Sequence, residues 1–412
     1  MRLAVFTNQF PGPINTFFAR DMRALIECGV ELDIFAIYPL ESAYWSAVPR
    51  IFPPDILARV PVHHLSRAEV LRARPSSSRA LWRSAAMVGA SARYGPVPAA
   101  KAAYAAGYAW RQAERLHGKA YDHVLAYWGN YAASAAAFFH AATRPEVPYS
   151  MFVHARMDLY RHPAWLEQKL LYADNIFVVC EYNRRYLARR YPAAYPRIAD
   201  RIHVHHLGMP LDDVAFTPAE RAENQLVAVG YLEPLKGFAG LLDAMALLSG
   251  RGIDARLDII GEGPDQALLQ SRIAALGLRQ HVTLRGRLPA DDVLAAMRRA
   301  TVLVHPSIRP DAMPTVIKEA MAVGTPVVAS DLAGIPEMLD GGRCGILVPP
   351  GDVPALAAGI ATMLGDPAAR HGFATRARAH MEGTFDLWRN GRVLADRLRS
   401  STRHAGTRMA LA

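Results

Sequence analysis

The chain has 412 residues, 51% of them hydrophobic and 20% charged, and carries a formal net charge of +10. This length exceeds what one ordinary core encloses and predicts two or more domains, while the apolar fraction excludes a disordered or fibrous chain. Cys28, Cys180 and Cys344 lie far apart, which argues against a disulfide framework or a cysteine-based zinc site. The positive charge comes mostly from arginine, and two interpretations stay open: a compositional bias, or contact with phosphates or anionic lipid.

Short apolar runs alternate with helix-length segments along the whole chain, which is typical of parallel α/β domains. A polar, proline-bearing stretch near residue 210 interrupts the alternation. It predicts an N-terminal domain of residues 1–212 and a C-terminal domain of residues 213–385, with a ligand cleft between them. Residues 386–412 are expected to form a helix that returns to the N-terminal domain, followed by a frayed tail. The expected strands are residues 3–6, 33–37, 124–128, 149–153, 176–179, 226–229, 257–260, 282–284, 302–304 and 327–329.

The sequence predicts neither a secretory signal nor a membrane span. The N-terminal apolar run ends at Asn8 and is too short for a signal peptide. Residues 123–143 carry no formal charge and could span a bilayer by length alone. Their polar side chains and alanines instead favour a strand, a turn at Gly129 and a helix over residues 131–142. We therefore expect a cytoplasmic protein.

Residues 66–119 interleave arginines with aromatic side chains, as in Trp82-Arg83 and Arg93-Tyr94. An amphipathic segment lying on a membrane has this composition. So does a solvated helix pair whose arginine stems cover apolar surface. Under the first interpretation the protein is peripheral on the inner face of the cytoplasmic membrane, and an anionic membrane surface is one of its partners.

Several catalytic signatures are missing from the chain. Lys236 is followed by Gly237 rather than Ser or Thr, so there is no Walker A motif, and neither HExxH, GxSxG nor Asp-x-Asp occurs. His203, His205 and His206 lie on a predicted strand where two of them could face the same way. A metal site there is an open alternative to an ordinary strand.

The most informative stretch is residues 302–337, VLVHPSIRPDAMPTVIKEAMAVGTPVVASDLAGIPE. It predicts a strand, a loop, a helix beginning near Thr315, a turn and a second strand. A helix N-terminus offers unpaired N–H groups and a positive dipole end, which suit a phosphate. Asp311 precedes this helix and Glu319 lies within it, so both can face one cleft if the loop turns back at Pro314. The alternative is that Asp311 caps the loop and Glu319 is a solvated helix residue.

This stretch resembles the donor-binding signature of the GT-B glycosyltransferases of family 4, in which seven residues separate two acidic ones. Asp311 and Glu319 match the acidic pair, and Pro306, Pro314 and Gly324 match its flanks. Further matches follow in order over nearly the whole chain: the loop around Gly12, His154 with Asp158, Cys180-Glu181, and the turn Gly261-Glu262-Gly263-Pro264.

The resemblance implies an α/β protein with the GT-B fold, two Rossmann-like doubly wound parallel-sheet domains facing across a cleft. It also implies four catalytic residues. Glu319 would accept hydrogen bonds from the ribose of a nucleotide sugar, and Asp311 would lie beside the sugar hydroxyls. Lys236 would neutralise the diphosphate, and His154 would lie against the sugar near the reacting carbon.

The donor-binding residues are implied by the same resemblance. Gly12 would allow the diphosphate to approach closely, and Leu288 lies in a segment that flanks the base. Gly261 belongs to the second-domain glycine turn. Backbone groups around the helix start would cradle the sugar and diphosphate, at Met313, Pro314, Thr315 and Val316.

Two departures from the family pattern affect the expected chemistry. Tyr231 replaces a basic residue, and losing one charge-assisted contact costs about 1.5–3 kcal/mol unless another group replaces it. Arg309 is the candidate replacement. Asp311 stands where the family has Glu, which keeps the charge but shortens its reach.

The sequence therefore predicts a retaining, metal-independent glycosyltransferase. The donor is a UDP- or GDP-sugar that serves as co-substrate, with no cofactor, metal or nucleic-acid partner. The acceptor is a glycan or a lipid-linked glycan of cell-surface polysaccharide or glycolipid synthesis. Two alternatives remain: a GT-B protein that binds nucleotide sugar or a partner without turnover, which Tyr231 favours, and another two-domain α/β enzyme such as a nucleotide-sugar epimerase.

Overall fold

The computed structural model describes residues 1–10, 16–38, 52, 57–154, 158–159, 165–218, 221–401 and 403. The chain divides into two compact units. The N-terminal unit comprises Met1–Gly208 and Leu387–Ala412, and the C-terminal unit comprises Met209–Asp386. These division points lie within four residues of the boundaries expected from the sequence. The expected frayed tail lies almost wholly outside the described residues.

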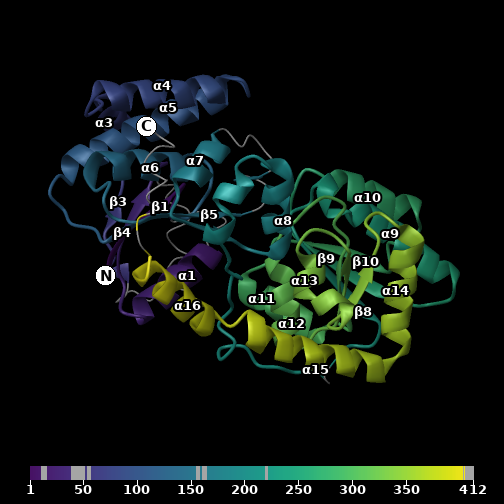
Figure 1. The fold of residues 1–412 in the computed structure, drawn as a ribbon. Helices are drawn as coiled ribbons and strands as arrows, with labels where there is room; N and C mark the ends of the chain where they lie inside the picture. The colour runs from purple at the N-terminus through teal and green to yellow at the C-terminus, as the bar shows by residue number, and fades with distance from the viewer. Residues whose placement is uncertain are drawn as a thin grey trace. The chain divides into compact units, whose positions relative to one another are not determined.

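The N-terminal unit is built on a parallel sheet with strand order β3-β2-β1-β4-β5-β6-β7 (Figure 1). Its elements are β1 Arg2–Thr7, α1 Thr16–Glu27, β2 Glu31–Ala36, β3 Val62–His63, α3 Arg67–Leu71, α4 Ser78–Ala92, α5 Pro96–Arg115, β4 His123–Ala126, α6 Tyr131–Thr143, β5 Tyr149–Val153, α7 Leu166–Tyr172, β6 Asn175–Val178, α8 Glu181–Arg190, β7 Ile202–Val204 and α16 Leu387–Arg399.

The C-terminal unit repeats this arrangement with strand order β10-β9-β8-β11-β12-β13. Its elements are β8 Gln225–Val229, α9 Phe238–Gly250, β9 Arg256–Ile260, α10 Gln266–Ala275, β10 Val282–Gly286, α11 Ala290–Arg299, β11 Val302–His305, α12 Thr315–Val323, β12 Val327–Ser330, α13 Ile335–Met338, β13 Ile346–Val348, α14 Val353–Gly365 and α15 Pro367–Thr384.

The sequence prediction of two doubly wound parallel sheets is confirmed, because the connections reverse direction in the middle of each sheet. All ten expected strands are present. The sequence missed the short strands β3 and β13 at the sheet edges. They are only two and three residues long and half-buried, so they carry little of the apolar signal that identifies a buried strand.

Each sheet is covered by helices on both faces. In the N-terminal unit one hydrophobic core joins the strands to helices α3 to α8, and a second core lies under α1 and α16. In the C-terminal unit α9, α10 and α14 share one core with the strands. Among the described residues, no helix is both long and apolar enough to cross a membrane.

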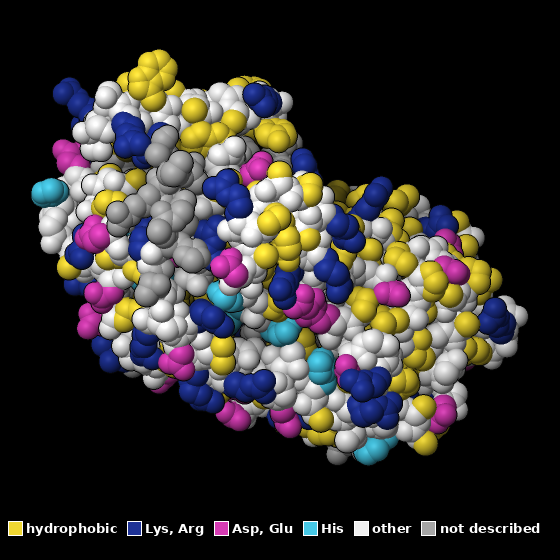
Figure 2. All heavy atoms as spheres, in the orientation of Figure 1, with side chains coloured by type: hydrophobic (Ala, Val, Ile, Leu, Met, Phe, Trp, Pro, Cys, Tyr) yellow, Lys and Arg dark blue, Asp and Glu magenta, His cyan; other side chains and the backbone are white. Residues whose placement is uncertain are grey.

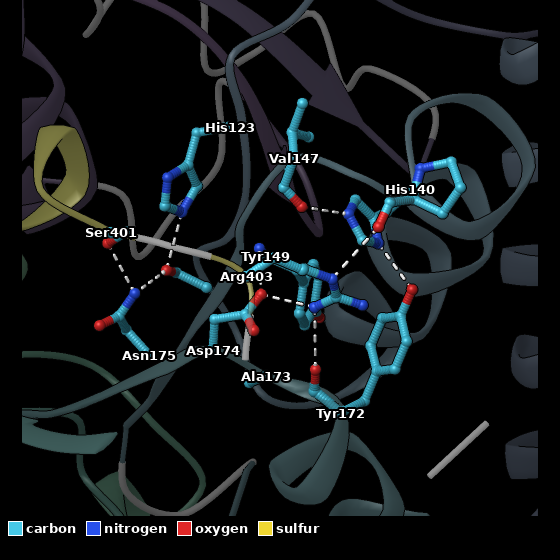
Figure 3. A network of polar contacts seen from close by, with 12 residues as sticks. His123, His140, Val147, Tyr149, Tyr172, Ala173, Asp174, Asn175, Ser401 and Arg403 are labelled. Carbon is cyan, nitrogen blue, oxygen red and sulfur yellow. Dashed lines mark hydrogen bonds and ion pairs between the residues drawn. The ribbon is translucent and has the colours of Figure 1, made fainter. Parts of the chain in front are cut away.

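Ser401 and Arg403, which follow α16, are fastened to the N-terminal sheet by a polar network (Figure 3). Arg403 forms an ion pair with the buried carboxylate of Asp174 and lies over the ring of Tyr172 at 4.8 Å. The hydroxyl of Ser401 accepts a hydrogen bond of 2.7 Å from Asn175. Because these partners flank the start of β6, the segment after α16 is part of the N-terminal fold.

Candidate active site

The C-terminal sheet changes direction between β8 and β11, which pair side by side. From β8 the chain continues to β9 and β10 on one side of the sheet, whereas β11, β12 and β13 lie on the other side. The loops that leave the carboxyl ends of β8 and β11 therefore diverge. In open α/β sheets such a switch point is where ligands bind. Lys236 follows β8, and Asp311 follows β11.

Two glycines let the turns at this edge pack backbone against backbone. Gly237 has φ = 72°, and a β carbon there would lie 2.0 Å from the carbonyl oxygen of Pro306. Gly261 has φ = 146°, and its β carbon would lie 1.9 Å from the carbonyl oxygen of Gly230. Only glycine meets both demands at each position. Gly261 thus holds the turn after β9 against the β8 loop, and Gly237 fixes Lys236 beside the β11 loop.

Lys236 and Asp311 form an ion pair across the switch point, with Nζ donating a hydrogen bond to Oδ2. Their side chains are 17% and 27% exposed, so the pair is partly shielded yet open to solvent. The sequence predicted both residues as ligand-binding groups but not their pairing. Asp311 thereby holds the ammonium group in place where an anion could approach it.

His305 ends β11 and is buried beneath this pair. Its Nε2 atom lies 3.1 Å from the hydroxyl oxygen of Ser307. Burial, reinforced by the charge of Lys236, lowers the pKa of His305 to about 4. At neutral pH this histidine adds no positive charge to the site, and Lys236 supplies the charge beside Asp311. Sequence reasoning did not single out His305, although it directly precedes Pro306.

Helix α12 begins at the same edge without a side-chain cap. Its N-cap residue is Pro314, which makes no capping hydrogen bond. Helix geometry leaves the N–H groups of Thr315 and Val316 without partners inside the helix, at the positive end of the helix dipole. Met313 and Pro314 are buried and fix where the helix starts. The local geometry is therefore that of an anion-binding helix start.

The other predicted residues of the C-terminal unit differ in exposure. Glu319 is half-buried within α12, and Arg309 is exposed on the loop before Asp311. Tyr231, in the turn after β8, is 56% exposed. Leu288 lines a separate cleft of about 270 Å³, together with Arg285 and Arg299 among others. Among the described residues, the structure therefore shows an ion pair between Lys236 and Asp311, and it shows no contact between Arg309 and Tyr231.

The N-terminal unit has its own switch point between β1 and β4, and His154 follows the next strand, β5. The ring of His154 is buried, with its centroid 4.6 Å from that of Trp128 and 5.3 Å from that of Phe17. Its Nε2 atom lies 2.8 Å from the carbonyl oxygen of Tyr127. A carbonyl only accepts hydrogen bonds, so Nε2 carries the proton. Burial lowers the pKa of His154 to about 4, and the ring is neutral at pH 7. Gly12 lies outside the described residues.

A buried acid, Asp158, lies next to His154, and a buried base, Lys169, lies near that acid. The backbone N–H of His154 donates a 3.0 Å hydrogen bond to Asp158, whose pKa burial raises to about 6. Lys169 donates a 3.0 Å hydrogen bond to the carbonyl oxygen of Asn130, and burial lowers its pKa to about 7. Both groups therefore titrate near neutral pH. The sequence offered no signal for Lys169, which looks like an ordinary helix lysine.

The histidines considered as metal ligands have other partners. His203 Nε2 lies 3.2 Å from Asn175 Oδ1, and His205 Nε2 lies 3.2 Å from Asp21 Oδ2. Within the described ranges, no group of three His, Cys, Asp or Glu side chains is placed to hold a metal ion. These contacts support the interpretation of His203 and His205 as ordinary residues of a strand and its end.

Fold and sequence comparisons define the class of protein. The crystal structure of HepE from Anabaena, in complex with UDP and glucose, matches with a TM-score of 0.70 at 19% identity, covering 97% of this chain and 100% of that chain. This likeness shows a shared fold, and the chain has the GT-B architecture. Residues 213–380 match the family of glycosyl transferases group 1. The matched segment lies within the C-terminal unit.

Two curated relatives show how far the sequence similarity extends. The alpha-D-kanosaminyltransferase of Streptomyces kanamyceticus is 29% identical over 275 residues, which are 60% of this chain and 69% of the relative. The amylovoran biosynthesis glycosyltransferase AmsK of Erwinia amylovora is 30% identical over 205 residues, 48% of this chain and 50% of the relative. The chain thus spans between half and about two thirds of these relatives.

Proposed function

We propose that this protein is a retaining, metal-independent glycosyltransferase that moves a sugar from a UDP- or GDP-sugar to a glycan or lipid-linked acceptor. The reaction serves cell-surface polysaccharide or glycolipid synthesis, on the cytoplasmic side of the membrane. The observation that carries the proposal is the Lys236–Asp311 pair beside the uncapped start of α12. The complex of HepE with UDP and glucose supports a nucleotide-sugar donor, and the role of AmsK in amylovoran synthesis supports a polysaccharide product.

The chemistry follows from where charge develops. Transfer breaks the bond between the anomeric carbon and the diphosphate oxygen, and an acceptor oxygen bonds to that carbon as its proton leaves. Negative charge grows on the diphosphate, where Lys236 and the amides of Thr315 and Val316 stabilise it. Because these groups are positioned before the reaction, little reorganisation is needed at the transition state.

The acidic residues act on the donor in a different way. The carboxylates of Asp311 and Glu319 accept hydrogen bonds from sugar and ribose hydroxyls, which fixes the orientation of the anomeric carbon. When the diphosphate arrives it shares Lys236 with Asp311. His154 is neutral at pH 7 and can orient a polar sugar group through its ring, but it contributes no positive charge.

A thermal-shift panel tests donor binding first. UDP, GDP and ADP are added with and without EDTA to the wild type, to Lys236→Ala and to the exposed control Arg279→Ala. A nucleotide at about 100 times its Kd stabilises the folded state by about 2.7 kcal/mol. We expect one nucleotide to stabilise the wild type and the control, to be indifferent to EDTA, and to lose its effect in Lys236→Ala. Loss of the shift in EDTA would overturn metal independence.

A transfer assay separates the proposal from the non-catalytic alternative. Donor consumption with a glycan or lipid-linked acceptor supports turnover, whereas nucleotide binding with no consumption supports a protein that binds without reacting. NMR of the anomeric proton in the product reads the configuration. Inversion of that configuration would overturn the retaining mechanism.

Tyr231 is the feature that favours the non-catalytic alternative, and Arg309 is its candidate compensation. If Arg309 supplies the missing charge, Arg309→Ala should lose donor affinity, and adding Tyr231→Arg should restore it. Strictly additive effects in the double variant would show that the two positions do not substitute for one another.

A further inference from the structure

An exposed apolar and basic surface lies on the N-terminal unit over helices α3 and α4 and the start of α5. Its most exposed hydrophobic side chains are Leu71 at 83% and Trp82 at 76%. Large hydrophobic side chains elsewhere on the described surface reach at most 58% exposure. We call this surface the α4 face, which consists of Leu71, Arg72, Arg74, Arg79, Leu81, Trp82, Ala85, Ala86, Gly89, Arg93, Tyr94 and Val97. Figure 2 shows hydrophobic and basic side chains side by side over α4 and α5 at the top of the view.

The polarity of α4 is inverted relative to an ordinary surface helix. The side chains it buries against the rest of the unit include Ser84 and Ser91, with Met87 between them. Its exposed residues are Leu81, Trp82, Arg79 and five small residues, of which four are alanine or glycine and one is serine. An ordinary surface helix turns its apolar stripe toward the core and its polar residues toward water. The inversion is explained if the outward face of α4 meets an apolar phase.

Positive charge is concentrated around the same face. Residues 66–119 contain ten lysines and arginines but only two acidic residues, in a chain whose net charge is +10. The two acids are already paired, Glu69 with Arg115 and Glu114 with Arg111. Arg72, Arg74, Arg79 and Arg93 are exposed. Four exposed arginines with no acidic residue of the same surface therefore flank the apolar side chains of the α4 face.

This combination fits an anionic bilayer better than a second protein copy. Two α4 faces brought together would oppose the same dense positive charge, and like charges repel at an interface. A bilayer with acidic headgroups attracts the arginines, while Trp82, Leu81 and Leu71 enter the boundary between headgroups and acyl chains. Long arginine side chains can reach up to phosphate from the same depth.

A cleft continues the face between α4, α7 and α8. It has a volume of about 690 Å³, and Ala86, Gly89 and Arg93 of α4 form one of its walls. Arg190 and Tyr191 at the end of α8 and Trp165 before α7 line it from the other side. The cleft is lined by two guanidinium groups, aromatic rings and one carboxylate, that of Glu167. Its net positive charge suits an anionic headgroup, because arginine pairs with phosphate and rings cover the apolar part of a ligand.

We propose that the α4 face docks the protein on an anionic membrane surface, with the cleft beside it receiving a phosphate-bearing lipid headgroup. This inference rests on the proposed function only in placing the acceptor at the membrane. Binding to lipid needs no donor and no catalysis, so it can succeed or fail independently of glycosyl transfer.

Vesicle flotation of the whole protein tests the docking directly. Vesicles of neutral phosphatidylcholine are compared with vesicles containing 30% phosphatidylglycerol, at low and high salt, without nucleotide. We expect binding to the anionic vesicles only, at least tenfold weaker in the double variant Leu81→Ser and Trp82→Ser. The triple variant Arg72→Ala, Arg74→Ala and Arg79→Ala should bind at least tenfold more weakly and lose its salt dependence. Arg190→Ala should weaken binding to vesicles but leave binding to immobilised heparin unchanged.

Matched controls give the test its power. Leu268→Ser removes a hydrophobic side chain that is 56% exposed on α10 of the other unit, and Arg279→Ala removes an exposed arginine there. Both should bind vesicles like the wild type, and nucleotide-induced thermal shifts should be unchanged in every variant of the face. Equal loss in the controls, equal binding to neutral vesicles, or no vesicle binding would overturn the proposal. A concentration-dependent dimer in sedimentation that the Leu81/Trp82 variant abolishes would instead assign the face to a second copy.

Discussion

The carboxyl edges of the two sheets share a topology but differ in the state of their polar groups. At the C-terminal edge, Lys236 and Asp311 keep opposite charges in a pair that solvent can reach. At the N-terminal edge, His154, Asp158 and Lys169 are buried. Burial shifts the pKa of each side chain in the direction that favours its neutral form. One edge carries a partly exposed ion pair, and the other holds a neutral buried histidine beside a carboxyl and an amine whose pKa values lie near neutral pH.

This difference shows that the carboxyl edges of two similar sheets can hold polar groups in different states. A charged pair that is partly exposed can exchange one partner for an incoming anion. A buried histidine bonded to a backbone carbonyl has a fixed orientation and little freedom to change charge. We therefore expect substitutions at the C-terminal edge to affect ligand binding, and acid to affect mainly the stability of the N-terminal unit.

The two units can be followed separately because tryptophan occurs in one of them alone. All six tryptophans fall within the sequence of the N-terminal unit: Trp45, Trp82, Trp110, Trp128, Trp165 and Trp388. Tryptophan fluorescence during urea unfolding therefore reports on that unit, while circular dichroism reports on both. The stability predictions below use this contrast.

The largest effect is expected from Gly237→Ala, because the new β carbon would lie 2.0 Å from the carbonyl oxygen of Pro306. The free energy of unfolding of the C-terminal unit should fall by at least about 3 kcal/mol. Gly252→Ala is the matched control, with φ = 78° and no atom near its β carbon, and should cost about 1 kcal/mol. The circular dichroism transition should move while the fluorescence transition stays. Equal effects of both variants would contradict the close approach.

Lys236→Ala should lower kcat/KM for the donor by at least about tenfold, the size of one charge-assisted hydrogen bond. Lys236→Arg keeps the charge and should retain more activity than the alanine variant. Steady-state kinetics measure both, with Arg279→Ala as the control for an exposed cation. Kinetics like those of the wild type in Lys236→Ala would remove this lysine from the site.

Acid should destabilise the N-terminal unit more than the C-terminal unit. Burial lowers the pKa of four histidines of the N-terminal unit from 6.5 to about 4, namely His123, His140, His154 and His203. In the C-terminal unit, the pKa of His305 is lowered in the same way. As the pH falls from 6.5 toward 4, the unfolded chain binds protons that the folded chain does not. The free energy of unfolding therefore falls over this range, by about 2 kcal/mol or more for the N-terminal unit.

Asp158 opposes part of this loss. Its folded pKa of about 6 lies above the ordinary value of 3.8, so its contribution to stability grows as the pH falls through 6. Urea unfolding at pH 7 and pH 5, followed by fluorescence and by circular dichroism, measures the balance. A fluorescence midpoint that does not move between these pH values would contradict the neutral, buried state of the histidines.

Glu319→Ala should weaken donor binding by about tenfold, because one hydrogen-bond acceptor for the ribose is lost. Glu319→Gln keeps an acceptor oxygen and should lose less. Isothermal titration with the nucleotide selected by the thermal-shift panel measures both affinities. Unchanged affinity in the alanine variant would return Glu319 to the role of an ordinary helix residue.

Much of the fold was predictable because its strands are buried on both faces. Runs such as residues 149–153 and 302–304 are almost purely apolar. A continuous apolar run of this kind is typical of a parallel strand that is buried on both faces. The start of α12 was equally readable, since Pro314 can begin a helix but cannot continue one. The sequence analysis did not predict the short edge strands β3 and β13, because half-buried segments of two or three residues carry no such pattern.

The site was predictable in its residue types and only partly in its arrangement. The order of Lys236, Asp311 and Glu319 along the chain predicts them as donor-binding groups, and their roles stay a prediction. It did not show that Lys236 pairs with Asp311, that Lys169 is buried beside Asp158, or that α4 turns Ser84 and Ser91 inward. These facts depend on which side chains exclude water from one another, and that is decided between elements far apart in the sequence.

By itself the sequence determined two parallel α/β domains and the chemical groups placed after their strands, because strand periodicity and turn residues act locally. The tertiary structure alone decided which groups stay charged. Desolvation and pairing depend on every neighbour in space, and they set the pKa of His154, the partner of Lys236 and the exposure of Trp82.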